Sequence, residues 1–136
     1  MERRHFVRTT LAGAASAAVG LAAAPAARAA QTPALHNIVF TENDPGHFAG
    51  LQKLHVPIVK VANGVLKVRT PHPMSEAHYI VSHTVVLEDG RFLSRKTFNW
   101  HDKPISEHPL PAGFKGTVTI TSTCNLHDWW LTRVTV

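Results

Sequence analysis

Threonine alternates with valine and isoleucine along Thr117–Thr123, which reads TVTITST. Successive side chains of a β-strand point to opposite faces, so this period of two predicts a strand with one apolar face. The strand leads directly into Cys124-Asn125-Leu126-His127, which contains the single cysteine of the chain. One end of this strand therefore carries a thiol and an imidazole three residues apart.

Six further segments show short β-branched runs or a period of two. They are Ile38–Phe40, Val56–Val61, Val65–Arg69, Tyr79–Leu87, Arg91–Trp100 and Trp130–Val136. Asn63-Gly64 lies between two of these segments and is typical of a tight hairpin turn, and Glu88-Asp89-Gly90 indicates a second hairpin. Residues 101–115 contain three prolines and are expected to form a loop. The pattern predicts an all-β protein, an immunoglobulin-like seven-stranded β-sandwich.

The first 29 residues have the features of an export signal. Arg3-Arg4 is followed by an uncharged, weakly apolar run from Leu11 to Ala24, and Ala27-Arg28-Ala29 provides a small-x-small cleavage site. The run is too short to cross a bilayer of about 30 Å as a helix, so no membrane span is expected. We predict a twin-arginine signal peptide at 1–29, a single domain at 30–136 and a periplasmic location. The twin-arginine route carries folded proteins, which favours a cofactor bound before export.

The net charge of +5 is concentrated in this predicted signal. Residues 1–29 hold four arginines against one glutamate, whereas residues 30–136 hold ten Lys and Arg against eight Asp and Glu. A nucleic-acid-binding domain needs a basic surface on the folded domain itself. The weak net charge of the predicted domain therefore argues against a nucleic-acid partner.

Histidine is the abundant ionisable residue, and nine of the ten histidines follow residue 29. With one cysteine, the chain has no intrachain disulfide and no four-cysteine metal site. Cys124 and His127 lie three apart, His72 and His78 lie six apart, and His55 precedes Val56-Pro57. Thiolate and imidazole together suit iron, copper or zinc better than magnesium or calcium. The remaining histidines of the domain are expected at solvated positions: His36, His47, His83, His101 and His108.

Three segments together resemble the superoxide reductases, the desulfoferrodoxin and neelaredoxin family. Pro71–Ile80 is similar to the H-P-M-x-x-x-H-Y-I segment of that family. Cys124–His127 with Trp130 resembles its C-N-x-H-G-L-W ending, and His55–Val59 resembles its K-H-V-P-V-I segment. The likeness runs in the same order from about Leu51 to the end of the chain.

The resemblance implies reduction of superoxide to hydrogen peroxide at one iron per chain. In this family four imidazoles surround the iron and a thiolate binds axially, which implies the ligands His55, His72, His78, Cys124 and His127. It also implies a separate one-electron donor protein and possible homo-oligomers. The four cysteines of the additional rubredoxin-like domain found in some members are absent, so the chain resembles the one-iron form.

The chain departs from the family pattern beside three of these segments. The family commonly has Glu-Lys before the first histidine, where this chain has Lys53-Leu54. Lys53 is the candidate for steering superoxide, although it stands one residue earlier than the family's lysine. Asp128 replaces a glycine, and Ser82 replaces a tryptophan.

Two other functions are compatible with parts of this pattern. A blue-copper electron carrier would use Cys124, His127 and one upstream histidine, but it would also need an axial methionine after the last histidine. The only methionines are Met1 and Met74, so this ligand is missing. A redox sensor of the same fold without turnover is the second alternative, which the missing Glu-Lys pair leaves open.

Overall fold

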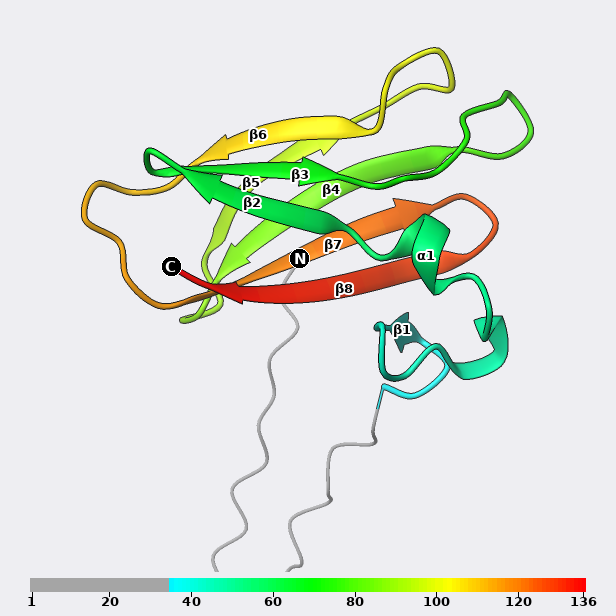
Figure 1. Cartoon of the computed structure of the whole chain (residues 1–136), viewed down its shortest axis with the longest axis horizontal. Helices are drawn as coiled ribbons and strands as arrows, with labels where there is room; N and C mark the ends of the chain where they lie inside the picture. Colours follow the sequence, from blue (N-terminus) through cyan, green and yellow to red (C-terminus); the bar gives the residue numbers. More distant parts are fainter. Residues whose placement is uncertain (1–34) are drawn as a thin grey trace, which may run out of the picture. The chain divides into compact units, whose positions relative to one another are not determined.

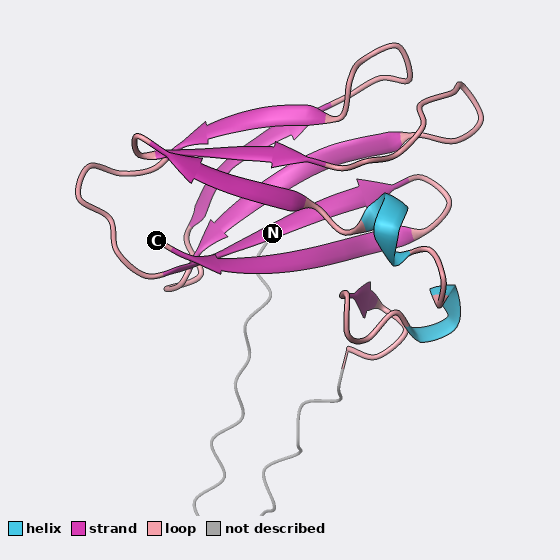
Figure 2. Cartoon of the chain, in the orientation of Figure 1, coloured by secondary structure: helices cyan, strands magenta, loops and turns pink. Residues whose placement is uncertain are grey.

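The computed structural model describes residues 35–136, and the predicted signal at 1–29 lies outside them. The strands are β1 (Val39–Phe40), β2 (Ile58–Ala62), β3 (Val65–Arg69), β4 (Ile80–Leu87), β5 (Phe92–Thr97), β6 (Ile105–Pro109), β7 (Thr117–Cys124) and β8 (Asp128–Thr135). A 3-10 helix, η1 (Gly46–Phe48), and one turn of α-helix, α1 (Gln52–His55), lie between β1 and β2. Figure 2 shows how few helical residues the described part contains. Neither of these short helices is long enough to cross a membrane.

The strands form two sheets that face each other (Figure 1). One sheet has the order β1-β8-β7-β4-β5, and the other has the order β2-β3-β6. The short strand β1 pairs in parallel with β8, and the other pairs are antiparallel. The prediction of an all-β sandwich is confirmed.

The main core lies between β3 of the smaller sheet and β4 and β7 of the larger one. It consists of Leu66, Val68, Val85, Leu87, Val118 and Ile120, all buried. In β7 the apolar residues of the TVTITST alternation are fully buried, whereas the threonines between them are half-buried. Burial of each Val, Leu or Ile side chain contributes roughly 1.5–3 kcal/mol, so this alternation determines which face of β7 turns inward.

The Asn63-Gly64 hairpin forms as predicted between β2 and β3. Both residues have positive φ, 51° for Asn63 and 72° for Gly64. These are the angles that a two-residue turn of type I′ requires, and they match the right-handed twist of the flanking strands. The turn sets the register in which Ala62 pairs with Val65.

The expectation of a loop throughout residues 101–115 is wrong. Ile105–Pro109 forms β6, which pairs with β3, so the described residues contain eight strands rather than seven. The inward-facing residues of β6 are Ser106 and His108, both buried. Because these residues are polar, the period-two signal of an apolar face is missing from the sequence.

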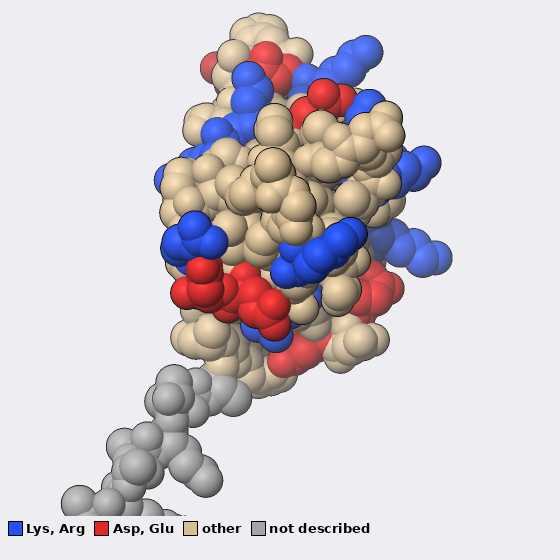
Figure 3. Space-filling view, turned by 90° about the vertical axis from the view of Figure 1, so that its left-hand side faces the viewer, with Lys and Arg blue, Asp and Glu red and all other residues tan. Residues whose placement is uncertain are grey.

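Acidic and basic side chains are interspersed on the face of the sandwich shown in Figure 3. This face lies at the end of the sandwich away from α1. Both signs of charge therefore occur close together there, in agreement with the small net charge of residues 30–136.

Candidate metal centre

Five side chains converge at the end of the sandwich that carries α1. They are His55, His72, His78, Cys124 and His127, and one potential ligand atom from each lies within 4.8 Å of all the others. His55 ends α1, and His72 and His78 come from the loop between β3 and β4. Cys124 ends β7, and His127 lies in the turn before β8. The structure thus brings together all five residues predicted from the sequence to be metal ligands.

The nitrogen atoms of the four imidazoles form a chain of close neighbours. His55 Nε2 lies 2.9 Å from His127 Nδ1, and His127 Nδ1 lies 3.1 Å from His78 Nε2. His78 Nε2 is also 3.1 Å from His72 Nε2. The Sγ atom of Cys124 lies 3.2 Å from His78 Nε2 and 3.6 Å from His127 Nδ1. His78 Nε2 therefore has three close neighbours but at most one proton, and hydrogen bonds alone do not account for the cluster.

A single metal ion accounts for these separations. Two imidazole nitrogens in adjacent positions about 2.1 Å from one metal would lie about 3.0 Å apart. The three observed N···N separations are 2.9, 3.1 and 3.1 Å. An adjacent thiolate sulfur at about 2.3 Å from the metal would lie about 3.1 Å from each nitrogen, close to the 3.2 Å found for His78. The donor set and its spacing fit one transition-metal ion.

His55 is held for this role by the short helix α1. Its Nδ1–H donates to the carbonyl of Leu51 at 2.9 Å, which leaves the lone pair of Nε2 directed toward the other ligands. The expectation that a strand begins at Val56, directly after His55, is wrong, because His55 ends α1 and β2 begins only at Ile58. One helical turn allows the Nδ1–H to reach the carbonyl four residues earlier, which an extended strand would not allow.

Asn125 connects the two loops that carry the other ligands. Its Oδ1 accepts the backbone N–H of Tyr79 at 2.9 Å, and its Nδ2 donates to the carbonyl of Ala77 at 3.0 Å. Its backbone N–H donates to the carbonyl of Tyr79. These three bonds hold His78 beside Cys124. The sequence did not predict this role of the Asn125 side chain, and its place in the Cys124–His127 segment was the signal that could have found it.

The pKa of the Cys124 thiol is raised, chiefly because the sulfur is buried. Backbone N–H groups of Leu126 and His127 act in the opposite direction by hydrogen-bonding the thiolate, and the carboxylate of Asp128 raises the pKa further. Without a metal the thiol is protonated at neutral pH, and metal binding releases its proton.

Three imidazoles of the cluster, those of His55, His72 and His127, are held neutral chiefly by burial, which lowers their pKa values. Burial, together with the neighbouring histidines, lowers the pKa of His72 to about 4. Burial is also the main cause of the lowered pKa values of His55 and His127. At neutral pH their ring nitrogens therefore have free lone pairs for a metal. The buried Nδ1 atom of His72 makes no hydrogen bond of ordinary geometry, and the backbone of the adjacent Pro73 raises the pKa of the ring only partly against burial.

Asp128 adopts the left-handed backbone conformation with φ 56°. Glycine adopts this conformation most easily, and aspartate is among the few other residues that tolerate it. Asp128 thus has a backbone conformation that suits glycine, the residue that the resembling family has at this position. The replacement adds a carboxylate next to His127. Burial lowers the pKa of His127 overall, and the negative charge of Asp128 partly opposes this lowering.

Aromatic rings cover one side of the cluster. Trp130 stacks against His55 with ring centroids 5.3 Å apart, and its Nε1–H donates to the carbonyl of His127 at 2.8 Å. Phe48 meets the ring of His127 edge to face at 5.0 Å. Trp130 is fully buried, so it excludes water from this side of the ligands.

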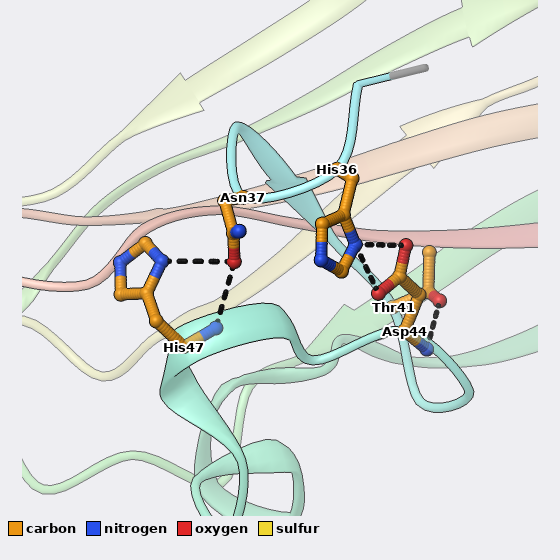
Figure 4. A network of polar contacts seen from close by, with 5 residues as sticks. All are labelled: His36, Asn37, Thr41, Asp44 and His47. Carbon is orange, nitrogen blue, oxygen red and sulfur yellow. Dashed lines mark hydrogen bonds and ion pairs between the residues drawn. The ribbon is translucent and has the colours of Figure 1, made fainter.

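A polar network holds the segment that carries Phe48 (Figure 4). Asn37 Oδ1 accepts hydrogen bonds from the backbone N–H of His47 at 2.8 Å and from its Nδ1 at 3.0 Å. His36 Nδ1 lies 2.9 Å from the carboxylate of Asp44, whose backbone N–H donates to Thr41 Oγ1. These bonds fold residues 36–47 back on themselves, and Phe48 follows directly.

Lys53 lies on α1 and is exposed, two residues before His55. Each residue of a helix turns about 100° around its axis, so residues two apart lie about 160° apart, and the side chains of Lys53 and His55 leave the helix on nearly opposite sides. Leu54 is 45% exposed beside the cluster ligand His55.

Two histidines expected at solvated positions are instead buried. His83 is fully buried in β4, and His108 is 1% exposed in β6, whereas His36, His47 and His101 are exposed as expected. The two buried histidines face hydroxyl side chains in the core. His83 lies in the largely apolar strand β4 and His108 in the polar strand β6, and neither pattern predicts a buried histidine. Their burial depends on hydroxyl partners that come mostly from other strands.

The sequence model of the Desulfoferrodoxin family matches residues 48–133, which include all five clustered residues. Comparison with curated proteins gives no match. Among solved structures, the fold is similar to a superoxide reductase (neelaredoxin) from Ignicoccus hospitalis, with 23% identity, a TM-score of 0.64 and coverage of 77% of this chain and 98% of the other.

Two further solved structures are similar to this chain. The superoxide reductase (1Fe-SOR) from Giardia intestinalis shares 21% identity with a TM-score of 0.55, over 62% of this chain and 99% of that one. A variant of the neelaredoxin from Archaeoglobus fulgidus in its reduced form shares 25% identity with a TM-score of 0.56, over 62% and 90%.

Proposed function

Because the chain belongs to the Desulfoferrodoxin family, we propose that it is a superoxide reductase that uses one iron bound by His55, His72, His78, Cys124 and His127. The observation that carries this proposal is the convergence of four imidazole nitrogens and one sulfur within 4.8 Å. Iron accepts both imidazole and thiolate ligands, and the separations fit a single ion. The solved structures of similar fold are named as superoxide reductases.

The overall reaction consumes one superoxide, one electron and two protons and forms one hydrogen peroxide. Iron supplies the redox couple that transfers the electron, and a separate donor protein restores the reduced state. The chain itself provides the ligand set and the local electric field. Four neutral imidazoles leave most of the metal's positive charge uncompensated, which attracts the superoxide anion.

Cys124 sets the electron-donating strength of the ligand set. Its thiolate donates electron density to the metal, and the N–H groups of Leu126 and His127 moderate this by hydrogen-bonding the sulfur. Asp128 opposes these N–H groups by adding negative charge near the sulfur. Trp130 and Phe48 shield one side of the ligands, so that solvent and substrate approach from elsewhere.

Metal content of the mature protein, exported through its own signal, tests the proposal first. We expect about one iron per chain and a fast second-order loss of superoxide when the reduced protein is mixed with it. Cys124→Ser is expected to abolish the thiolate-to-metal absorption band and most of the activity. Stoichiometric copper, or no metal, would overturn the proposal.

The blue-copper alternative is not favoured by the cluster. Four imidazoles converge, whereas a blue-copper site uses two with one cysteine. The sulfur of Met74 accepts the backbone N–H of Ile80 at 3.3 Å and packs with Ile80, Phe98 and Cys124 in a small apolar cluster. Met74 therefore has a structural role in the loop between His72 and His78.

The proposal includes export to the periplasm by the twin-arginine route, with residues 1–29 as the signal. The support for it is the sequence Arg3-Arg4 with the apolar run and cleavage site that follow. Replacing both arginines, Arg3→Lys with Arg4→Lys, should retain the protein inside the cell while leaving its metal content unchanged. Periplasmic accumulation of this double variant would contradict the proposal. The donor protein and a possible homo-oligomer also remain proposals.

A further inference from the structure

Six polar side chains form a continuous chain of contacts through the interior of the sandwich. In order along the chain of contacts they are Ser94, His108, Ser106, His83, Thr70 and Ser122, called here the buried polar chain. The successive contacts are 2.6 Å between Ser94 Oγ and His108 Nδ1, 2.8 Å between His108 Nε2 and Ser106 Oγ, and 2.7 Å between Ser106 Oγ and His83 Nδ1. They continue with 2.9 Å between His83 Nε2 and Thr70 Oγ1 and 2.7 Å between Thr70 Oγ1 and Ser122 Oγ.

The buried polar chain crosses between the two sheets four times in five contacts. Ser94, His83 and Ser122 belong to β5, β4 and β7 of the larger sheet, whereas Ser106 and His108 belong to β6 and Thr70 follows β3 in the smaller one. Only the contact between Ser106 and His108 stays within one sheet. The chain therefore links the two sheets by directional bonds, in contrast to the apolar core beside it.

Every link of this chain can be satisfied at once. A neutral imidazole has one N–H donor and one acceptor nitrogen, and a hydroxyl donates once and accepts as well. The donors can thus all point in one direction from Ser94 to Ser122, or all in the other. Burial lowers the pKa of His83 to about 3 and also lowers that of His108, so both rings are neutral as this pattern requires. Changing one member leaves its neighbour with an unsatisfied buried group.

One end of the chain reaches the segments that hold two proposed metal ligands. Thr70 lies two residues before His72, and Ser122 lies two residues before Cys124. The carbonyl of Thr70 accepts the backbone N–H of His72 at 2.8 Å, and the N–H of Thr70 donates to the carbonyl of Pro104. The hydroxyl bond between Thr70 and Ser122 therefore ties the segment of His72 to that of Cys124.

We propose that Thr70 is a positioning residue for the metal centre, and that its hydroxyl, held by Ser122 and His83, sets the separation between His72 and Cys124. Nδ1 of His72 makes no hydrogen bond of ordinary geometry, and the backbone group that acts on this ring belongs to the next residue, Pro73. The orientation of this ligand therefore depends on its own segment, which the backbone bonds of Thr70 to His72 and Pro104 hold in place. The inference rests on the proposed metal centre and is independent of the reaction with superoxide.

The substitution Thr70→Val tests this directly, because valine keeps the branched shape of threonine and replaces only the hydroxyl, by a methyl group. Cobalt(II) and iron(II) are titrated into the metal-free full domain, and the energy of the thiolate-to-metal absorption band is recorded. Thr70→Val is expected to weaken metal binding about 10- to 100-fold, the range typical of lost outer contacts to a metal ligand. The absorption band is expected to shift, which a general loss of stability does not cause. Thr70→Ser, which restores the hydroxyl, should return both properties close to those of the wild type.

Thr121→Val is the matched control, because Thr121 lies next to Ser122 on β7 but its side chain points to the opposite face. It should bind metal as the wild type does. Ser122→Ala removes the same hydrogen bond from the other side and gives a second test if Thr70→Val does not fold. Wild-type affinity and band energy in a folded Thr70→Val or Ser122→Ala protein would overturn the inference. So would a loss in Thr121→Val equal to that in Thr70→Val.

The outcomes also separate this inference from the proposed function. A wild-type protein that binds no metal would refute the proposed centre itself. A wild-type protein that binds metal but does not reduce superoxide would refute the function and leave the role of Thr70 open to the same titration.

Discussion

His55 Nε2 lies 2.9 Å from His127 Nδ1, although 72 residues separate them in the chain. One nitrogen comes from the end of a helical turn and the other from the turn between β7 and β8. Two neutral imidazoles with facing nitrogens gain little from each other unless a proton or a metal lies between them. The pair therefore belongs to the proposed metal centre. It is the contact of that centre that short sequence spacing predicts least, because the two histidines are far apart in the chain.

Replacing His127 by alanine is expected to weaken metal binding more than about 100-fold. Loss of a hydrogen-bond partner of a metal ligand typically weakens metal binding about 10- to 100-fold, so loss of the ligand itself should weaken it more. The measurement is an equilibrium titration of the metal-free protein with iron(II). His101→Ala removes an exposed histidine outside the cluster and should leave the affinity unchanged. Equal affinities for the two variants would contradict the ligand assignment.

Asp128→Asn should lower the pKa of the Cys124 thiol in the metal-free protein. The carboxylate of Asp128 raises that pKa, and asparagine removes the charge while tolerating the same left-handed backbone conformation. The rate of thiol alkylation as a function of pH reports the change. Glu76→Gln, an exposed change in the loop between His72 and His78, is the control. An unchanged thiol titration in Asp128→Asn would show that solvent screens the charge completely.

Leu54→Lys is expected to accelerate the reaction of the reduced protein with superoxide. Leu54 is 45% exposed beside the proposed ligand His55, and a lysine there adds positive charge near the proposed metal centre. Electrostatic steering raises association rates by about tenfold or more at low ionic strength. Stopped-flow mixing at low and high salt measures the second-order rate. Val61→Lys adds the same charge at a residue that is also 45% exposed, in β2, and should change the rate much less. An equal rate for Leu54→Lys and the wild type would count against steering at this position.

The metal-free protein should lose stability as the pH falls from about 6.5 toward 3. Burial lowers the pKa of His83 from 6.5 to about 3 in the folded state, so between these values the unfolded chain binds the extra proton. The free energy of unfolding is then largest above pH 6.5 and falls with decreasing pH, by at most about 1.4 kcal/mol per pH unit for this group.

Urea unfolding at several pH values measures this dependence. His83→Gln, which keeps a donor and an acceptor but does not titrate, should show a shallower decline than the wild type. His101→Gln, at an exposed position, should decline as the wild type does. If the wild type and His83→Gln decline in parallel, His83 is not the titrating group.

Much of the fold was predictable because its signals are local. The alternation in Thr117–Thr123 identifies β7 from nearest neighbours alone, and Asn63-Gly64 requires positive φ wherever it occurs as a tight turn. Strand β6 was missed because its inward residues, Ser106 and His108, are polar. Their burial depends on hydrogen-bond partners in β4 and β5. The pattern of residues within β6 itself does not reveal these partners.

The candidate site also has one part that local spacing in the sequence predicts and one part that it does not. Cys124 and His127 share one turn, and His72 and His78 share one loop, so their association follows from short spacing. The place of His55 at the end of a helical turn, and its tautomer, depend on the Leu51 carbonyl and were not predicted.

The types of ligand and the face of β7 that turns inward follow from the order of residues, because side-chain chemistry and a period of two are properties of neighbours along the chain. The separation of the ligand atoms and the buried hydroxyl bond between Thr70 and Ser122 arise only when the two sheets pack. That bond joins residues 52 apart in sequence, and its energy is gained only after folding has brought both sheets together.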